Sequence, residues 1–262
     1  MQYALISDIH ANLPALEAVL ADIDRRGPGT IFHLGDLVGY APWADETVAV
    51  LRDRRILGVA GNYDSTVATG YKHCGCRYED ARQEELSHVS YDWTRRHVSP
   101  ETMEYLAALP FRLDLRPAGG HLPGATLILV HGTPTLNTLY WTEDRSDEFC
   151  LRMAAHAGLR AGDIIAFGHT HRPWHRVIDG IHFVNTGSVG RPKDGDWRAG
   201  YVQLTVEGSE VGVEFVRVEY DLARAMAGIR DRGLPVEFAT ALETGGSFPA
   251  APGPAAASRI TP

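Results

Sequence analysis

This chain has few cysteines, no excess of basic residues and no long apolar run, and each of these features excludes a class of protein. Three cysteines among 262 residues cannot build a disulfide framework, and so few favour a reducing compartment. Lys and Arg number 25 against 33 Asp and Glu, which gives a net charge of −8 and excludes a general nucleic-acid-binding protein. No apolar run approaches the roughly 18 residues of a membrane span, and the opening residues lack a signal-peptide pattern. We expect a soluble, cytoplasmic protein with no membrane partner.

The composition that remains is that of an ordinary globular protein. Apolar residues make up 44% of the chain and charged residues 22%. Residues 1–244 are enough for one domain with a large core. Residues 245–262 hold four prolines, five alanines and three glycines without any core-forming pattern, so we predict a disordered tail there. Nothing in the sequence indicates an oligomeric state.

Short apolar runs alternate with helical patterns along most of the chain, which predicts an α/β (α+β) fold. The runs at 3–6, 30–34, 56–60, 126–130 and 163–167 have the length and composition of buried strands. Helical periodicity follows the first two runs, covers 79–109, and returns at 147–157 and near the end of the chain. Residues 175–206 are typical of antiparallel hairpins. Each of the five runs is followed by polar residues, at the place where open α/β sheets form their ligand crevice.

Seven oxygen or nitrogen donors follow these five strands, and none of them is a thiolate. Along an extended segment residues i and i+2 point the same way, so the pairs at 8 and 10 and at 169 and 171 should each face one side. Such a donor set suits Mn, Fe, Zn, Co or Mg, and seven ligands are enough for two ions that share one carboxylate. The donors are Asp8, His10, Asp36, Asn62, His131, His169 and His171.

The order and spacing of these blocks resemble the calcineurin-like metallophosphoesterase family. The blocks are Asp8-Ile9-His10, Gly35-Asp36, Gly61-Asn62-Tyr63-Asp64, His131-Gly132 and Gly168-His169-Thr170-His171. The glycine-rich stretch 185–190 also resembles a segment that these proteins carry after the paired histidines. One block alone would carry little weight, but five in the family's order are a specific signal.

The resemblance implies a four-layer αββα sandwich of two mixed β-sheets, with a dinuclear metal centre at the carboxyl ends of the strands. One metal would be held by Asp8, His10, Asp36 and His171, and the other by Asp36, Asn62, His131 and His169. Manganese is the first choice of metal, with Fe, Zn, Co or Mg as alternatives. The nucleophile would be a hydroxide that bridges the two ions.

One position departs from the family pattern. The third block usually carries histidine after the asparagine, where this chain has Tyr63. A phenol can donate a hydrogen bond but is a much weaker acid than imidazolium. Family members without this histidine tend towards diesters. We therefore expect a phosphodiesterase of small or nucleotide diesters, cyclic nucleotides included, with Asn62 and Tyr63 as catalytic residues. A phosphomonoesterase or protein phosphatase is the alternative, and a non-catalytic scaffold of the same fold is a more distant one.

Several further residues allow both a functional and a structural interpretation. Arg172 and Arg191 would clamp a phosphate or pair with acidic surface residues. Aromatic side chains in loops would stack on a nucleobase or cover the core edge. The cluster at 73–76 offers three donors, and we expect a mobile loop there rather than a metal site. We expect His33 in the core, Asn12 behind the ligands or at a helix start, and substrate specificity from the loops 71–79 and 133–146. The aromatic residues considered are Tyr40, Trp43 and Trp141, and the cluster is His73, Cys74 and Cys76.

Overall fold

The computed structural model describes residues 1–247 apart from 28, 77, 79, 116–124 and 209. Its strands are β1 (Gln2–Ile6), β2 (Thr30–His33), β3 (Leu57–Gly58), β4 (Arg112–Leu115), β5 (Leu127–Val130), β6 (Ile164–Phe167), β7 (Trp174–Ile178), β8 (Ile181–Asn185), β9 (Ala199–Glu207) and β10 (Glu210–Val218). Its helices are α1 (Leu13–Arg26), α2 (Ala44–Asp53), α3 (Asn62–Thr69), α4 (Ala81–His97), α5 (Pro100–Ala108), α6 (Asp147–Ala157), α7 (Leu222–Asp231) and α8 (Val236–Glu243).

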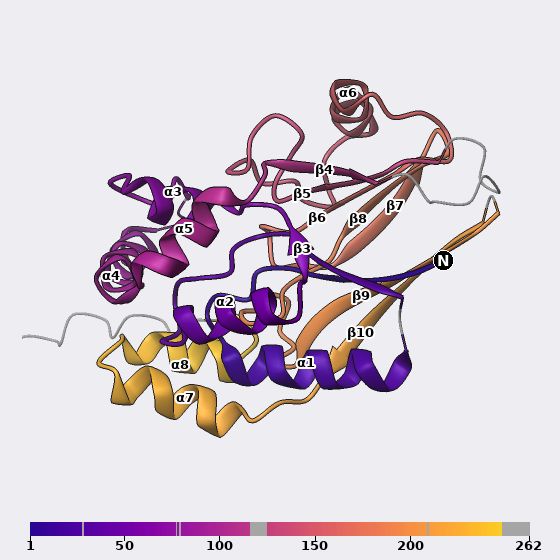
Figure 1. Cartoon of the computed structure of the whole chain (residues 1–262). Helices are drawn as coiled ribbons and strands as arrows, with labels where there is room; N and C mark the ends of the chain where they lie inside the picture. The colour runs from indigo at the N-terminus through magenta and orange to yellow at the C-terminus, as the bar shows by residue number, and fades with distance from the viewer. Residues whose placement is uncertain (28, 77, 79, 116–124, 209, 248–262) are drawn as a thin grey trace, which may run out of the picture.

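Two mixed five-stranded sheets face each other at the centre of the molecule (Figure 1). The first has the order β10-β9-β1-β2-β3, with β1, β2 and β3 parallel and β9 and β10 antiparallel. The second has the order β4-β5-β6-β8-β7, with β5, β6 and β8 parallel and the two edge strands antiparallel. Because the three parallel strands of each sheet are neighbours, their carboxyl ends gather at one side of the sandwich.

Three apolar clusters hold the layers together. The cluster between the sheets includes Leu5, Leu129 and Val202. A larger cluster packs the outer face of the first sheet against α1, α2, α7 and α8, and a third packs α6 on the outer face of the second. This arrangement is the αββα sandwich that the sequence predicts.

Most of the predicted elements are confirmed. Ser99 accepts a hydrogen bond from the Thr102 backbone and so separates the predicted helical stretch into α4 and α5. The sequence interpretation missed α3, which begins directly at Asn62, and the strands β4 and β10. In β10 most side chains are only partly buried or exposed, so its apolar pattern is weak.

The first residues of the predicted tail are bound to the folded domain. Within residues 245–247, Gly245 accepts a hydrogen bond from the Gly195 backbone and Gly246 donates one to Ala241. The rest of the predicted tail lies outside the described residues.

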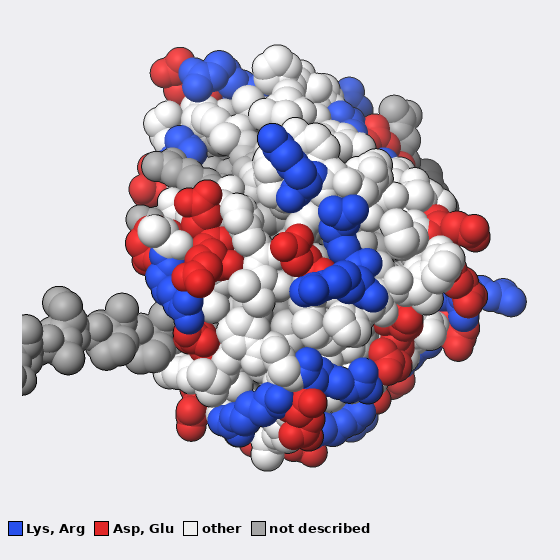
Figure 2. Space-filling model, turned by 90° about the vertical axis from the view of Figure 1, so that its left-hand side faces the viewer, with Lys and Arg blue, Asp and Glu red and all other residues white. Residues whose placement is uncertain are grey.

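Acidic and basic side chains are interspersed on the face shown in Figure 2. In the described part of the chain, no helix combines the length and apolarity that crossing a membrane requires.

Candidate metal centre

The predicted ligands lie on tight turns that follow the parallel strands, and five of them have left-handed backbone conformations. The φ angles are 51° at Asp8, 49° at His10, 52° at Asp36, 65° at His169 and 59° at His171. Side chains other than glycine rarely adopt this conformation, and it persists where the surroundings fix it. The expectation that 8/10 and 169/171 alternate along extended backbone is therefore wrong, although both pairs do face the centre.

The first ligand group joins the two sheets. Nε2 of His171 lies 3.2 Å from Oδ1 of Asp8 and 3.2 Å from Nε2 of His10. Asp8 and His10 follow β1 of the first sheet, whereas His171 follows β6 of the second. These three buried residues offer one ligand atom each, all within 4.8 Å of one another.

The second group is built in the same way. Nε2 of His131 lies 3.1 Å from Nδ1 of His169 and 3.0 Å from Oδ1 of Asn62. Oδ2 of Asp36 is 3.5 Å from Nε2 of His131 and 3.7 Å from Nε2 of His10, so this oxygen stands between the two groups. The structure therefore brings all seven predicted donors together, with Asp36 in the shared position.

The hydrogen bonds of the histidines leave ligand atoms aimed at the centre. Nδ1 of His10 contacts the Val38 carbonyl at 3.0 Å, and Nδ1 of His131 contacts that of Leu34 at 2.7 Å. Nδ1 of His171 contacts the Arg191 carbonyl in the same manner. A carbonyl only accepts, so each Nδ1 carries a proton, and in the neutral form of each ring Nε2 is the unprotonated ligand atom.

Buried polar atoms without partners provide the test of whether metal ions fit this site. Oδ1 of Asp8 is buried and has no hydrogen-bond partner in the described structure, although it belongs to the first ligand group. The Nε2 atoms of His10 and His171 face each other at 3.2 Å, although neither carries a proton to share. Burial without a partner is costly, and a cation between such atoms removes that cost. The residues fit two divalent ions.

The electrostatics of the site agree with ligand chemistry. Burial, reinforced by neighbouring cationic groups, lowers the pKa of His10 and of His169 to about 3, and these imidazoles are neutral at pH 7. Burial would also lower the pKa of His131, but the Asp36 carboxylate beside it outweighs burial and raises this pKa. A metal ion that binds here would displace the proton of His131.

Tyr63 is buried beside the centre, but its hydroxyl is directed elsewhere. The hydroxyl lies 3.4 Å from Oγ of Ser87 and 3.4 Å from Oγ of Ser90, both on α4. Its ring meets the His10 ring edge-on, with centroids 5.6 Å apart. The geometry favours a packing role, and proton donation by this phenol stays a prediction.

A pocket opens over the two ligand groups, and charged and aromatic side chains line it. Arg191 is 8% exposed, and its guanidinium carbon lies 3.8 Å from the centroid of the Tyr40 ring. Arg172 donates from Nε to the Lys193 carbonyl at 2.9 Å. Loops 71–79 and 133–146 contribute Cys76, Tyr78 and Tyr140. The lining residues used below are Tyr40, Cys76, Tyr78, Tyr140, Arg172, Arg191 and Lys193.

The remaining candidates divide between the site and the core. Asn12 caps α1 and also donates to the Gly190 carbonyl, at 2.9 Å, behind the ligand turns. Trp141 is fully buried and stacks on Phe167, and Trp43 packs against the helix that holds Gly228, so neither faces the pocket. His33 lies in the core as expected.

Sequence reasoning missed three contributors to the site. Ser7 donates to Oδ2 of Asp8 at 2.6 Å, and the Tyr140 ring lies 4.2 Å from that of His169. Cys74 and Cys76 form a disulfide, where we expected only a mobile loop. Ser7 adjoins the first block and could have been suspected, whereas the other contacts join segments with no motif.

Comparison with known proteins identifies the family. The model of the calcineurin-like phosphoesterase superfamily domain matches residues 1–209. The chain belongs to this superfamily. This superfamily uses a dinuclear divalent metal site, and the described structure contains two candidate metal-binding groups.

The similarity of this phosphoesterase to its relatives extends over nearly the whole chain. The uncharacterized protein MJ0912 of Methanocaldococcus jannaschii is 31% identical over 255 residues, which cover 88% of this chain and 93% of that protein. The crystal structure of a metallophosphoesterase from Sphaerobacter thermophilus is 30% identical with a TM-score of 0.70, covering 94% of this chain and 99% of that one. The hypothetical protein PH1004 from Pyrococcus horikoshii shares the fold, with 21% identity, a TM-score of 0.77 and coverage of 94% and 98%.

Proposed function

We propose that this phosphoesterase is a phosphodiesterase that depends on two divalent metal ions and hydrolyses small or nucleotide diesters, cyclic nucleotides included. The observation that carries the proposal is the pair of buried ligand groups that share Asp36, beside a position 63 that holds no imidazole. Asp8, His10, Asp36 and His171 would hold one ion, and Asp36, Asn62, His131 and His169 the other. Manganese is the proposed metal.

The chain's own residues would prepare the site. When bound, the two ions would supply Lewis acidity to the phosphoryl oxygens and lower the pKa of water. Ser7 and the His169 backbone N–H, which donate to Oδ2 of Asp8, leave Oδ1 for a metal. The Tyr63 backbone N–H donates to Oδ1 of Asp36 at 2.9 Å and leaves Oδ2 between the groups. Such prepositioned ligands need no reorganisation when a substrate binds.

The charge of the site favours a diester, which carries one negative charge. Two divalent ions held by the two carboxylates would leave a positive excess at the site, because Asn62 is neutral where a third carboxylate would reduce that excess. The proposed substrate anion matches that excess. The absence of an imidazole at position 63 removes a group that would assist a monoester leaving group.

One observation favours the alternative, a phosphomonoesterase or protein phosphatase. Arg172, Arg191 and Lys193 line the same pocket and add positive charge for the second negative charge of a monoester. The two functions therefore differ in which substrate class is turned over faster.

The test is a side-by-side assay of bis(4-nitrophenyl) phosphate and 4-nitrophenyl phosphate, with chelator-treated protein and again after Mn²⁺ is restored. We expect turnover only with metal and a larger kcat/KM for the diester. Asp36→Asn should lower activity by more than about 100-fold because it changes the shared ligand, and the exposed Asp92→Asn should not. Faster monoester hydrolysis would select the alternative, and diester turnover that survives Asp36→Asn would exclude the proposed centre.

A further inference from the structure

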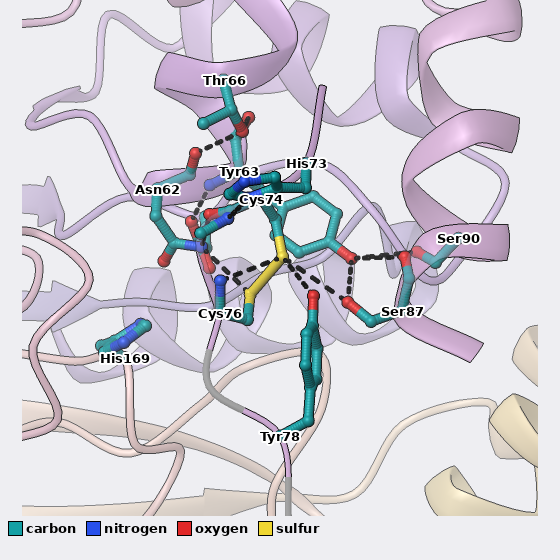
Figure 3. Close-up of a disulfide and its surroundings, with 12 residues drawn as sticks. Asn62, Tyr63, Thr66, His73, Cys74, Cys76, Tyr78, Ser87, Ser90 and His169 are labelled. Atoms are coloured by element: carbon teal, nitrogen blue, oxygen red, sulfur yellow. Dashed lines mark hydrogen bonds between the residues drawn. A yellow bond between two sulfur atoms is a disulfide. The ribbon is translucent and has the colours of Figure 1, made fainter. Parts of the chain in front are cut away.

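A disulfide lies against the proposed metal centre. Cys74 and Cys76, in the segment between α3 and α4, are joined across a single glycine, with Cα atoms 5.5 Å apart (Figure 3). Cys74 is buried at 1% exposure, whereas Cys76 is partly exposed and lines the pocket together with His169 and Tyr78. One sulfur of the pair therefore borders the space that a substrate would enter.

This disulfide loop holds the side-chain amide of Asn62. Nδ2 of Asn62 donates to the Cys74 carbonyl at 2.9 Å and to Sγ of Cys76 at 3.3 Å. An amide that donates both N–H groups on one side must present its oxygen on the other. That oxygen faces Nε2 of His131 at 3.0 Å, inside the second ligand group. The loop thus determines which atom of Asn62 points to the metal position.

The position of the disulfide argues against a purely structural role. In the chain-entropy description, a disulfide stabilises a fold more when it closes a longer loop, and a loop of three residues is very short. Cys150, the third cysteine, lies on the buried face of α6 and is not disulfide-bonded. In reducing compartments, disulfides are mostly transient and serve catalysis or redox sensing.

We propose that Cys74 and Cys76 form a thiol–disulfide switch that sets the metal affinity of the site. The switch acts through Asn62, because the disulfide loop orients the side-chain amide of that residue. The inference rests on the proposed metal centre. In the oxidised state the covalent bridge fixes the Cys74 carbonyl and the Cys76 sulfur as acceptors for the amide. In the reduced state the loop is released, the amide is free to rotate, and metal affinity falls.

The reducing partner would be a protein or small-molecule dithiol. Its thiolate attacks Sγ of Cys76, the bond between the two sulfurs breaks, and the Cys74 sulfur leaves as a thiolate that takes up a proton. The second thiolate of the reductant then attacks the reductant's own sulfur in the mixed disulfide, so that Cys76 leaves and is protonated. Two electrons and two protons pass to the cysteine pair, and the dithiol becomes a disulfide.

The experiment compares Mn²⁺ binding by oxidised and reduced full-length protein. Metal-free protein is treated either with oxidised glutathione or with a phosphine reductant, and the reagents are removed. The chain has three cysteines, so thiols counted in denaturant should number one in the oxidised protein and three in the reduced protein. Free Mn²⁺ followed by electron paramagnetic resonance should show a Kd about 10- to 100-fold higher after reduction, and reoxidation should reverse the change.

A double variant provides the matched control. Cys74→Ser with Cys76→Ser cannot form the bridge, so its Kd should equal that of the reduced protein and ignore both treatments. The melting temperature of the metal-free protein shows whether the variant folds, and the reversible change in the wild type tests the switch without any variant.

Three results would overturn the proposal. The first is three thiols after oxidation, and the second is an equal Kd in both states of a protein that binds Mn²⁺. The third is tighter Co²⁺ binding after reduction with a thiolate-to-cobalt charge-transfer band, which would make Cys76 a ligand. Absence of Mn²⁺ binding in either state would instead contradict the metal centre on which the switch rests.

Discussion

At the residue scale, Tyr63 shows how one side chain can adjoin a reactive centre without facing it. Its backbone N–H holds Asp36, its ring borders His10, and its hydroxyl reaches Ser87 and Ser90. Burial and the neighbouring Tyr40 raise the pKa of the phenol well above its ordinary value, which makes it a poorer acid still. The backbone and the ring, rather than the hydroxyl, connect Tyr63 to the centre.

Tyr63→Phe tests this interpretation. The ring and the backbone N–H remain, so we expect the diester kcat/KM to change less than about threefold, and the free energy of unfolding to fall by about 1 kcal/mol through the lost hydrogen bonds. Steady-state kinetics and urea unfolding measure the two effects. General acid catalysis contributes roughly 100-fold or more, so a loss of that size would establish the phenol as the proton donor.

A second residue-scale prediction concerns His33, which is fully buried at the end of β2. Neither of its ring nitrogens has a hydrogen-bond partner within the described structure, and burial lowers its pKa to about 3. A histidine whose pKa is lower folded than unfolded binds its proton preferentially in the unfolded state. Stability is therefore complete above about pH 6.5 and is lost as the pH falls towards 3.

We expect His33→Leu to reduce this acid sensitivity. Between pH 7 and pH 5 the wild type should lose about 2 kcal/mol more of its free energy of unfolding than the variant does. This figure follows because pH 5 lies about 1.5 units below the pKa of an unfolded histidine, and each unit corresponds to about 1.4 kcal/mol. Urea unfolding of metal-free protein at the two pH values measures the difference. Exposed His156→Gln is the control and should follow the wild type. Equal losses in His33→Leu and the wild type would show that His33 is not held neutral.

At the element scale, the ligand turns are stacked so closely that glycine is required between them. A Cβ on Gly190 would lie 1.7 Å from the Ile9 carbonyl oxygen, and one on Gly61 would lie 2.1 Å from Oδ1 of Asp36. The backbone of Gly190 donates to the Asp8 carbonyl. The glycine-rich stretch 185–190 therefore packs directly against the turn that carries Asp8 and His10. This close packing explains why position 190 is a glycine.

Gly190→Ala should consequently disturb the centre from outside the ligand set. The methyl group must displace the turn that carries Asp8 and His10, at a cost of about 1–3 kcal/mol in stability and with weaker Mn²⁺ binding. Gly212→Ala is matched to it, because a Cβ there meets Thr205 at an ordinary 3.6 Å. Thermal unfolding and Mn²⁺ titration of both variants measure the effects. Indistinguishable variants would mean that the turns can separate without loss.

The same elements show what the sequence could predict and what it could not. Strand ends followed by Asp, His and Gly are local signals, so the five blocks and their meeting place follow from the chain alone. The left-handed turns, and the sulfur acceptor beside Asn62, depend on contacts between segments far apart in the sequence. The direction of the Tyr63 hydroxyl depends on Ser87 and Ser90, which no periodicity connects to position 63.

At the scale of the whole molecule, the proposed metal centre connects the two sheets, because its ligands come from both. Asp8, His10, Asp36 and Asn62 follow strands of the first sheet, whereas His131, His169 and His171 follow strands of the second. Without ions, the joint relies on contacts such as that of Nδ1 of His131 with the Leu34 carbonyl and on the apolar layer between the sheets. Metal ions held by both groups would tie the halves together.

Metal binding should therefore stabilise the entire fold rather than one loop. At a free Mn²⁺ concentration of 100 times Kd, one site contributes about 2.7 kcal/mol, which for a chain of this size raises Tm by roughly 5–10 °C. Scanning calorimetry of chelator-treated and Mn²⁺-loaded protein should show one transition that moves as a whole. Asp36→Asn should lose most of the shift, because its oxygen stands between both groups. Two transitions, of which only one responds to Mn²⁺, would show that the ions bind within one sheet and do not join the halves.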